Sequence, residues 1–586
     1  MNTNPSAVLW GRYLPWLLML VILATLVGVV APNRGAPWDS DDALFLRMSW
    51  DAAHGYGLDT MLPQSPSYLF HALLIKMGMV ELLHFRYVNY GMALFSSLIF
   101  FLGLDRRRFH SPIVPLAVCA TLLNQVRSIE NPNTLSMAFF LLSAGFYFFS
   151  DSACGTRKYH LVMLSALWLA VAGFMHAAAM VAMLVLTMIY WIVDPAIRRS
   201  LFYPVFYLVS FLLWYYYISS LGLDLLLRDP AAHTLDRFYL VLRVALIGIF
   251  HISPVFLFFL ILLVCVPFGR RKFDVAHIVA SVFVTFYCLV PISLLTGSEP
   301  YSFDGWIKNV SVMTGYTFFL LYFILLRSVG NNGSIDRPLL EVVRSRPEIR
   351  HTMIAVCGLV LLPSALSVGS NAHFIHGMNF FAGPVLGVLF FLWERIDSQS
   401  NIRKMLQWGW LGVFVILALT HNHPVGRLDL SSSDRVSLQV SPLRGIRETN
   451  RYAAVLNVLK EVSQAGKCQD KVLITLDYIP LIHTILQHPA PNEIGVVRPT
   501  YYFPEDRLRS TLQGASGWCV IDVTTSETRD AIAGNKGKDN RTAIRTMVEA
   551  QSDYVIDFPT PGPPLVGNAR LFVRLTAAEK QSLIQP

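Results

Sequence analysis

The chain has 586 residues, of which 54% are hydrophobic and only 15% are charged. This composition is typical of a chain that lies mostly in lipid, and it excludes an ordinary soluble domain. The formal net charge of +9 would suggest nucleic acid in a soluble protein, but membrane proteins place such an excess in their cytoplasmic loops, so no nucleic-acid partner is expected.

Thirteen apolar runs are predicted to be membrane-spanning helices, because each approaches the roughly 20 residues that a bilayer requires. The first run lacks a small-residue cleavage pattern and is followed by further runs, so it is predicted to be an uncleaved anchor. The fold class predicted for residues 1–421 is therefore a polytopic α-helical membrane domain. The runs lie near residues 12–31, 84–104, 111–127, 134–150, 160–175, 177–193, 202–222, 238–268, 275–295, 309–328, 352–369, 379–394 and 405–421.

Lysine and arginine concentrate in alternate loops, for example at 106–108, 270–272 and 403–404. Short loops that are rich in these residues stay in the cytoplasm. With the N-terminus inside and an odd number of spans, everything after residue 421 is predicted to lie outside. The expected location is a bacterial cytoplasmic (inner) membrane, with the C-terminal domain extracytoplasmic.

An acidic segment at residues 38–58 follows the first span and contains Asp39, Asp41 and Asp42 within four positions. Carboxylates so close repel one another, which raises the pKa of at least one unless a cation, a metal or helix amides compensate. Aspartate is also favoured at helix N-caps and in first turns, so capping alone is an equal alternative. The cluster lies beside a predicted membrane surface, which favours a chemical role.

Two interfacial helices are predicted in the first outer loop, residues 32–83. The first runs from Asp42 to about Ala53, with an ion pair between Arg47 and Asp51 four positions apart. The second stretch, residues 65–83, is interrupted by charged residues and is predicted to lie along the membrane surface.

From residue 422 to residue 586 the sequence becomes mixed and polar, and it is long enough for one independent domain. Its helical and strand patterns predict a small extracytoplasmic α/β sandwich. The predicted helices lie near 447–465, 480–488 and 540–551, and the predicted strands at 471–478, 518–523, 553–558 and 569–575.

Only two of the seven cysteines, Cys468 and Cys519, lie in this domain. In an oxidising compartment a disulfide between them would close a loop of about 50 residues and contribute ~4 kcal/mol on the chain-entropy estimate. We predict this disulfide; two buried free thiols on adjacent strands are the alternative.

The two interfacial helices, the acidic pair that opens the first of them, the many spans and the outer α/β domain together resemble the glycosyltransferase C (GT-C) superfamily. Asp41-Asp42-Ala43, Arg47 and His54-Gly55-Tyr56-Gly57-Leu58 are similar to the D-D-A…R…H-G-x-G-L signature of one branch. That branch contains the arabinofuranosyltransferases that build mycobacterial wall polysaccharides, together with related pilin glycosylation and flagellar motor-control proteins.

A second segment, at 373–386, is similar to the family's D-F-M-H-G-R-x-x-x-P pattern through Phe374, His376, Gly377 and Pro384. It departs from the pattern at His373 and Met378, where the family has Asp and Arg. These departures put in doubt any donor-phosphate or sugar contact at the two positions.

The resemblance implies an enzyme that moves a sugar, arabinofuranose in its namesake members, from a polyprenyl-phosphate donor to a polysaccharide or pilin acceptor. The residues support a lipid-linked donor independently, because the chain has no phosphate-binding glycine fingerprint and the outer compartment lacks nucleotide sugars. Arg243, inside the eighth predicted span, is the most informative cation, although snorkelling to the interface is its alternative explanation. The predicted donor-phosphate and substrate contacts are Arg47, His54, Lys76, Arg127, Glu130, Arg243 and His376.

Asp41 is predicted to be the catalytic base that accepts the proton of the acceptor hydroxyl, with Asp42 orienting it or holding a cation. If the reaction retains configuration, the same carboxylate would be the nucleophile. A divalent metal held by Asp39, Asp41 and Asp42 stays open, since no ligand spacing demands it.

Two other classes of protein stay open. A transporter or flippase of lipid-linked saccharide would also need many spans, but it predicts inverted repeats, which the sequence does not show. A non-catalytic envelope or motility assembly protein would keep the helices without transferring sugar.

Overall fold

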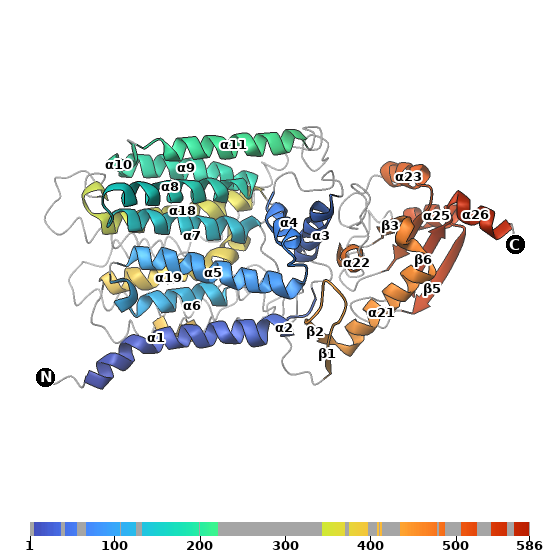
Figure 1. Cartoon of the computed structure of the whole chain (residues 1–586), viewed down its shortest axis with the longest axis horizontal. Helices are drawn as coiled ribbons and strands as arrows, with labels where there is room; N and C mark the ends of the chain where they lie inside the picture. Colours follow the sequence, from blue (N-terminus) through green and yellow to red (C-terminus); the bar gives the residue numbers. More distant parts are fainter. Residues whose placement is uncertain are drawn as a thin grey trace, which may run out of the picture.

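The structure is a computed structural model, and it is mostly helical with a small C-terminal sheet region (Figure 1). Every structural statement below refers to the residues that it describes. These are residues 5–36, 41–55, 66–105, 107–124, 132–198, 200–220, 343–369, 374–396, 407–409, 411–412, 434–476, 480–486, 505–523, 541–559 and 568–584.

A bundle of roughly parallel and antiparallel helices forms one half of the molecule, and the C-terminal α/β unit (residues 434–584) forms the other (Figure 1). We call the end of the bundle that includes Asn33 and Leu82, and faces this unit, the proximal end; the distal end includes Leu104 and Ser150. The bundle helices are α1 (Pro5–Thr25), which continues through the π-helical turn η1 (Leu26–Val30) into α2 (Ala31–Asn33), α5 (Leu82–Leu104), α6 (Ile113–Leu123), α7 (Pro132–Ser150), α8 (Gly155–Phe174), α9 (Ala177–Val193), α10 (Pro195–Arg198), α11 (Phe202–Ser220), α18 (Pro347–Gly369) and α19 (Phe374–Ile396).

Three helical segments in the described part are long and apolar enough to cross a membrane: Tyr13–Asn33, Leu82–Leu104 and Asn133–Ser150. The other long helices run beside them, but α6 has only 11 residues, about 16 Å, which is short of the hydrocarbon thickness. The predicted runs near 238–268, 275–295 and 309–328, and most of 405–421, lie outside the described residues. The count of thirteen spans therefore stays a prediction.

Small residues allow the bundle helices to pack closely, as in other membrane proteins. A Cβ atom on Gly145 of α7 would lie 2.8 Å from the backbone of Ile99 of α5, so only glycine fits there. On the other side of α7, a Cβ on Gly358 of α18 would lie 1.9 Å from the ring of Phe140, which is completely buried. Helix α7 is thus held between two neighbours at van der Waals distance.

We expect Gly358→Ala to lower the free energy of unfolding by about 1–3 kcal/mol, because Phe140 has no space into which to move. Gly91→Ala on α5 is the matched control, since a Cβ there meets nothing within 4 Å and alanine favours the helix by about 0.5–1 kcal/mol. Thermal unfolding in detergent measures both. Equal midpoints for the two variants would contradict this packing.

The two helices predicted in the first loop are present as α3 (Asp41–His54) and α4 (Tyr68–Lys76). Helix α3 extends one residue beyond the predicted helix at each end. The second helix is much shorter than the predicted stretch 65–83, because the chain turns at Gly78, whose φ of +91° favours glycine, and α5 then begins at Leu82.

The C-terminal α/β unit is built on a four-stranded sheet in the order β3-β4-β6-β5. The neighbours β3 and β4 pair in parallel, and the pairs β4–β6 and β6–β5 are antiparallel. Side chains alternate between its two faces. Leu473, Cys519 and Leu571 contact one apolar core, which includes residues of α21 and α22, and Trp518 and Val520 contact another, which includes residues of α23 and α25. The elements are β1 (Arg435–Ser437), β2 (Arg447–Thr449), α21 (Asn450–Ala465), η5 (Cys468–Asp470), β3 (Val472–Thr475), α22 (Pro480–Ile485), α23 (Glu505–Gly514), β4 (Trp518–Asp522), α25 (Arg541–Gln551), β5 (Tyr554–Pro559), β6 (Asn568–Arg574) and α26 (Ala577–Ile584).

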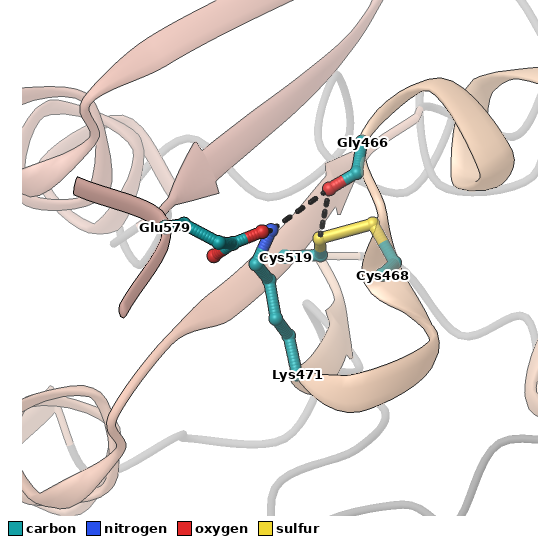
Figure 2. The surroundings of a disulfide bond; sticks show 5 residues. All are labelled: Gly466, Cys468, Lys471, Cys519 and Glu579. Carbon is teal, nitrogen blue, oxygen red and sulfur yellow. Dashed lines mark hydrogen bonds and ion pairs between the residues drawn. A yellow bond between two sulfur atoms is a disulfide. The ribbon is translucent and has the colours of Figure 1, made fainter. Parts of the chain in front are cut away.

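Cys468 and Cys519 are joined by a disulfide, as the sequence analysis predicts, with their Cα atoms 5.8 Å apart. The bond ties the turn before β3 to β4, and both residues are completely buried. Figure 2 shows the Lys471 ammonium beside it, donating to the carbonyl of Gly466 at 3.0 Å and pairing with Glu579 at 3.0 Å. The disulfide and the ion pair, of which the Lys471 side chain is buried, together connect α26, the η5 turn and the sheet.

Candidate functional site

Asp41 and Asp42 are the first two residues of α3. The first amides of a helix have no partner within it, and the helix dipole favours negative charge at this end. The start of α3 is therefore a position that favours negative charge. Asp39 lies outside the described residues, so the structure gives the backbone positions of Asp41 and Asp42 but not that of Asp39.

Helix α3 is enclosed between the proximal end of the bundle and the C-terminal α/β unit (Figure 1). Phe45 and Leu46 contact the same apolar core as Leu481 of α22. On another face, Met48 packs with Tyr68 of α4 and Tyr217 of α11, whose hydroxyl oxygens lie 2.7 Å apart. The helix that the sequence predicts at the membrane surface is thus covered by protein on two of its faces.

Arg47 and Asp51 form the predicted ion pair, but it is a buried one. Nε of Arg47 lies 3.4 Å from Oδ2 of Asp51, and the two side chains are only 6% and 4% exposed. Burial raises the pKa of Asp51 to about 6, although the Arg47 charge opposes the shift. Because this guanidinium already faces a carboxylate, Arg47 is less suited to hold a donor phosphate than the sequence predicts.

Asp51 is a titratable group that the sequence analysis treats only as a helix partner. Its Oδ1 atom is buried and has no hydrogen-bond partner among the described residues. Its pKa near neutrality is of the kind found at functional sites. The burial of Asp51 could have been predicted from the sequence, because apolar residues occur on every side of α3. This pattern indicates a helix without a solvent-exposed face.

We expect the pKa of Asp51 to make stability depend on pH. Because its pKa of about 6 in the folded chain exceeds the usual value of 3.8, its contribution is complete below the lower value and is lost as the pH rises to about 6. The melting temperature of the wild type, relative to Asp51→Asn, should therefore fall between about pH 4 and about pH 7. A constant difference over this range would show that Asp51 does not titrate there.

His54 lies away from the acidic pair, whereas Lys76 follows Ile75, which packs in the same apolar core as Ala43 at the start of α3. His54 ends α3, thirteen residues after Asp41 and thus about 20 Å along the helix axis, and its Nδ1 lies 2.8 Å from the carbonyl oxygen of Trp50. Lys76 is the last residue of α4 and is exposed. The structure therefore separates His54, but not Lys76, from the start of α3 by the length of that helix.

The segment around His376 lies at the same end of the bundle as α3. It forms the beginning of α19 rather than a loop between spans. Glu394, near the other end of α19, accepts a hydrogen bond from Arg107 at the distal end, so Phe374 and His376 lie about 27 Å away, toward the proximal end. The two segments that carry the family resemblance thus converge on one end, while Arg127, Glu130 and Arg243 lie outside the described residues.

The distal end contains charged residues that neutralise one another. Arg107 bridges Asp105 and Glu394, and Asp151 contacts Arg350 and, at 2.7 Å, Nε2 of His351. Although burial favours the neutral form, these contacts hold the pKa of Asp151 below its usual value. A cavity of about 530 Å³ lies among these residues, but every carboxylate that lines it already has a cationic partner, so we assign this end a structural role.

No protein-family model matches the chain, and no curated protein matches it either. Within the described ranges no group of three or more His, Cys, Asp or Glu side chains is placed to hold a metal ion. The predicted metal ligands Asp39, Asp41 and Asp42 are not tested by that result, because none of their side chains is among those described. The interpretation of the site therefore depends on its geometry.

Proposed function

We propose that this chain is an integral membrane glycosyltransferase that transfers a sugar, with arabinofuranose as the first candidate, from a polyprenyl-phosphate donor to a glycan or pilin acceptor on the extracytoplasmic side. One observation carries the proposal. The acidic pair Asp41-Asp42 opens a helix that is enclosed between the ends of apolar helices and a folded α/β unit. A lipid-linked donor can keep its tail in the bilayer while its phosphate reaches such a site.

The proposed reaction exchanges one C–O bond for another at the anomeric carbon. Asp41 accepts the proton of the acceptor hydroxyl, whose oxygen attacks that carbon while its bond to the donor phosphate breaks. The polyprenyl phosphate leaves with the bonding electrons, and cations stabilise its charge. His376, Arg127, Arg243 and Lys76 are the proposed cations, and among these the position of His376 at the proximal end supports its role best.

Purified protein in lipid nanodiscs, incubated with a synthetic polyprenyl-phosphate arabinofuranose and a glycan acceptor, tests the proposal. We expect labelled sugar in the acceptor and free polyprenyl phosphate in equal amounts. The anomeric configuration of the product, determined by NMR, separates a base from a nucleophile at Asp41, and a chelator tests for a metal.

Two results would overturn the proposal. Labelled donor that crosses vesicle membranes without sugar transfer would indicate a flippase. Absence of both activities, together with a cellular phenotype that survives loss of Asp41 and Asp42 but not of residues 434–584, would indicate an assembly protein.

A further inference from the structure

The chain just before α3 is held by a buried arginine of α5. Arg86, only 1% exposed, donates to the carbonyl oxygens of Ala31 and Gly35 at 2.7 Å each and also to that of Arg34. The Ala31 carbonyl lies in the last turn of the first helix, and those of Arg34 and Gly35 follow it; carbonyls at a helix end lack partners within the helix. Burial of a guanidinium is costly unless its donors are satisfied, so these contacts fix the exit of the chain from the first helix.

A carboxylate from a distant part of the chain meets the same segment. Oε2 of Glu448, in β2, accepts a hydrogen bond from the amide of Ala36 at 2.8 Å, and Oε1 accepts one from the amide of Thr449 at 3.1 Å. Glu448 is 5% exposed. A Cβ atom on Gly35 would lie 2.4 Å from Oε2, so the glycine is what allows the carboxylate to approach the backbone.

The loop between β1 and β2 also holds the beginning of α5. The amide of Leu82 donates to the carbonyl oxygen of Pro442 at 2.7 Å, and the amide of Arg444 donates to Oε2 of Glu81 at 3.2 Å. Leu443, completely buried, packs in the same core as Leu82. We call residues 434–449 the clamp, because they bind the chain both before α3 and after α4.

We propose that the clamp positions the acidic end of α3, so that Glu448 and Arg86 are positioning residues for Asp41. Only four residues separate Ala36 from Asp41, so the two lie at most about 18 Å apart. Anchoring Ala36 therefore limits where Asp41 can lie, and the contacts of α22 with α3 limit it from the other side. The C-terminal α/β unit is in this view part of the reaction centre.

The positioning role rests on the proposed glycosyl transfer, whereas the clamp itself does not, and this difference allows separate tests. Glu448→Ala removes the acceptor for the Ala36 amide, and Glu448→Gln keeps an oxygen that can accept the same hydrogen bond. Gly35→Ala places a methyl group where the Glu448 carboxylate lies, and so displaces the carboxylate from the Ala36 side of the contact. Glu549→Ala is the matched control, because its side chain is 53% exposed on the same unit and pairs only loosely with Arg570, at 3.7 Å.

Hydrogen exchange of the full-length protein in nanodiscs tests the clamp without reference to activity. In Glu448→Ala and Gly35→Ala, we expect faster exchange in peptides that cover residues 31–45, with no change in α7. Glu448→Gln and Glu549→Ala should exchange like the wild type. Wild-type exchange at residues 31–45 in Glu448→Ala would overturn the clamp, and if that variant does not fold, Gly35→Ala provides the same test.

Kinetics of sugar transfer test the positioning. We expect kcat to fall about ten- to a hundred-fold in Glu448→Ala, since small displacements of a catalytic group cost rates of this order. The KM for donor should stay within about twofold of wild type, and Glu448→Gln should restore most of kcat. Faster exchange with unchanged kcat would overturn the positioning role. An inactive wild type with the expected exchange pattern would overturn the proposed transfer and leave the clamp intact.

Discussion

Asp41→Asn is expected to lower kcat for sugar transfer by about a hundred- to ten-thousand-fold, the range in which a positioned general base contributes. Asparagine has nearly the same shape and is also favoured at helix starts, so α3 should keep its place at the proximal end. The amide cannot accept the hydroxyl proton, and the KM for donor should change little. Single-turnover transfer with labelled donor measures the chemical step directly.

Two further variants make this result specific. Asp557→Asn, on a β5 side chain that is 70% exposed, controls for the loss of one negative charge and should leave kcat unchanged. Asp42→Asn should have a smaller effect than Asp41→Asn if it only orients the base. Full activity in Asp41→Asn would remove Asp41 from the reaction, and a larger loss in Asp42→Asn would exchange the two roles.

Loss of the disulfide is expected to lower the free energy of unfolding of the C-terminal α/β unit by about 4 kcal/mol. The bond joins residues 51 positions apart, and the double variant Cys468→Ala, Cys519→Ala releases that loop in the unfolded chain. Both residues are completely buried in the core of the sheet, so the two missing sulfur atoms also leave space there. Pulse proteolysis in urea, with mass spectrometry of fragments from residues 434–584, measures the midpoint.

The control for this experiment is Cys154→Ala, which removes an exposed free cysteine and should leave the midpoint unchanged. Reductant should lower the midpoint of the wild type toward that of the double variant. It should also slow the migration of the unfolded protein on a gel. A wild type that is indifferent to reductant in both assays would mean that the bond is not formed in the protein as purified.

Local patterns in the sequence predict most of the elements that the structure describes. Helix α3 differs from its prediction by one residue at each end. Each predicted strand of the C-terminal region overlaps an observed one, because alternating apolar residues face two cores. The stretch 65–83 was predicted too long because its apolar content hid the turn at Gly78.

Very short elements, and a helix with a largely polar sequence, were not predicted. The strands β1 and β2 have three residues each, too few to show a period of two. Helix α23 buries Leu508 and Leu512 in a largely polar sequence, so its apolar signal is weak. Their positions depend on contacts with distant parts of the chain, which a local pattern does not contain.

The sequence predicts the helix that carries the candidate site but not the surroundings of that helix. The sequence indicates a helix that opens with Asp41 and Asp42, and the structure has it. It does not indicate that Arg47 and Asp51 are buried together. The contact of Glu448 could not be predicted for a different reason. Its partner, Ala36, is 412 positions away, and no local periodicity links the two residues.

That separation has a consequence for biogenesis. A ribosome that adds about 5–20 residues per second needs roughly 20–80 s to proceed from Ala36 to Glu448. Throughout that interval the newly made α3 has neither β2 nor α22 to cover it, and its apolar faces are open to chaperones and proteases. Helix α3 can therefore be covered only after about three quarters of the 586 residues have been made, and a nascent chain that stalls before residue 448 keeps these apolar faces exposed.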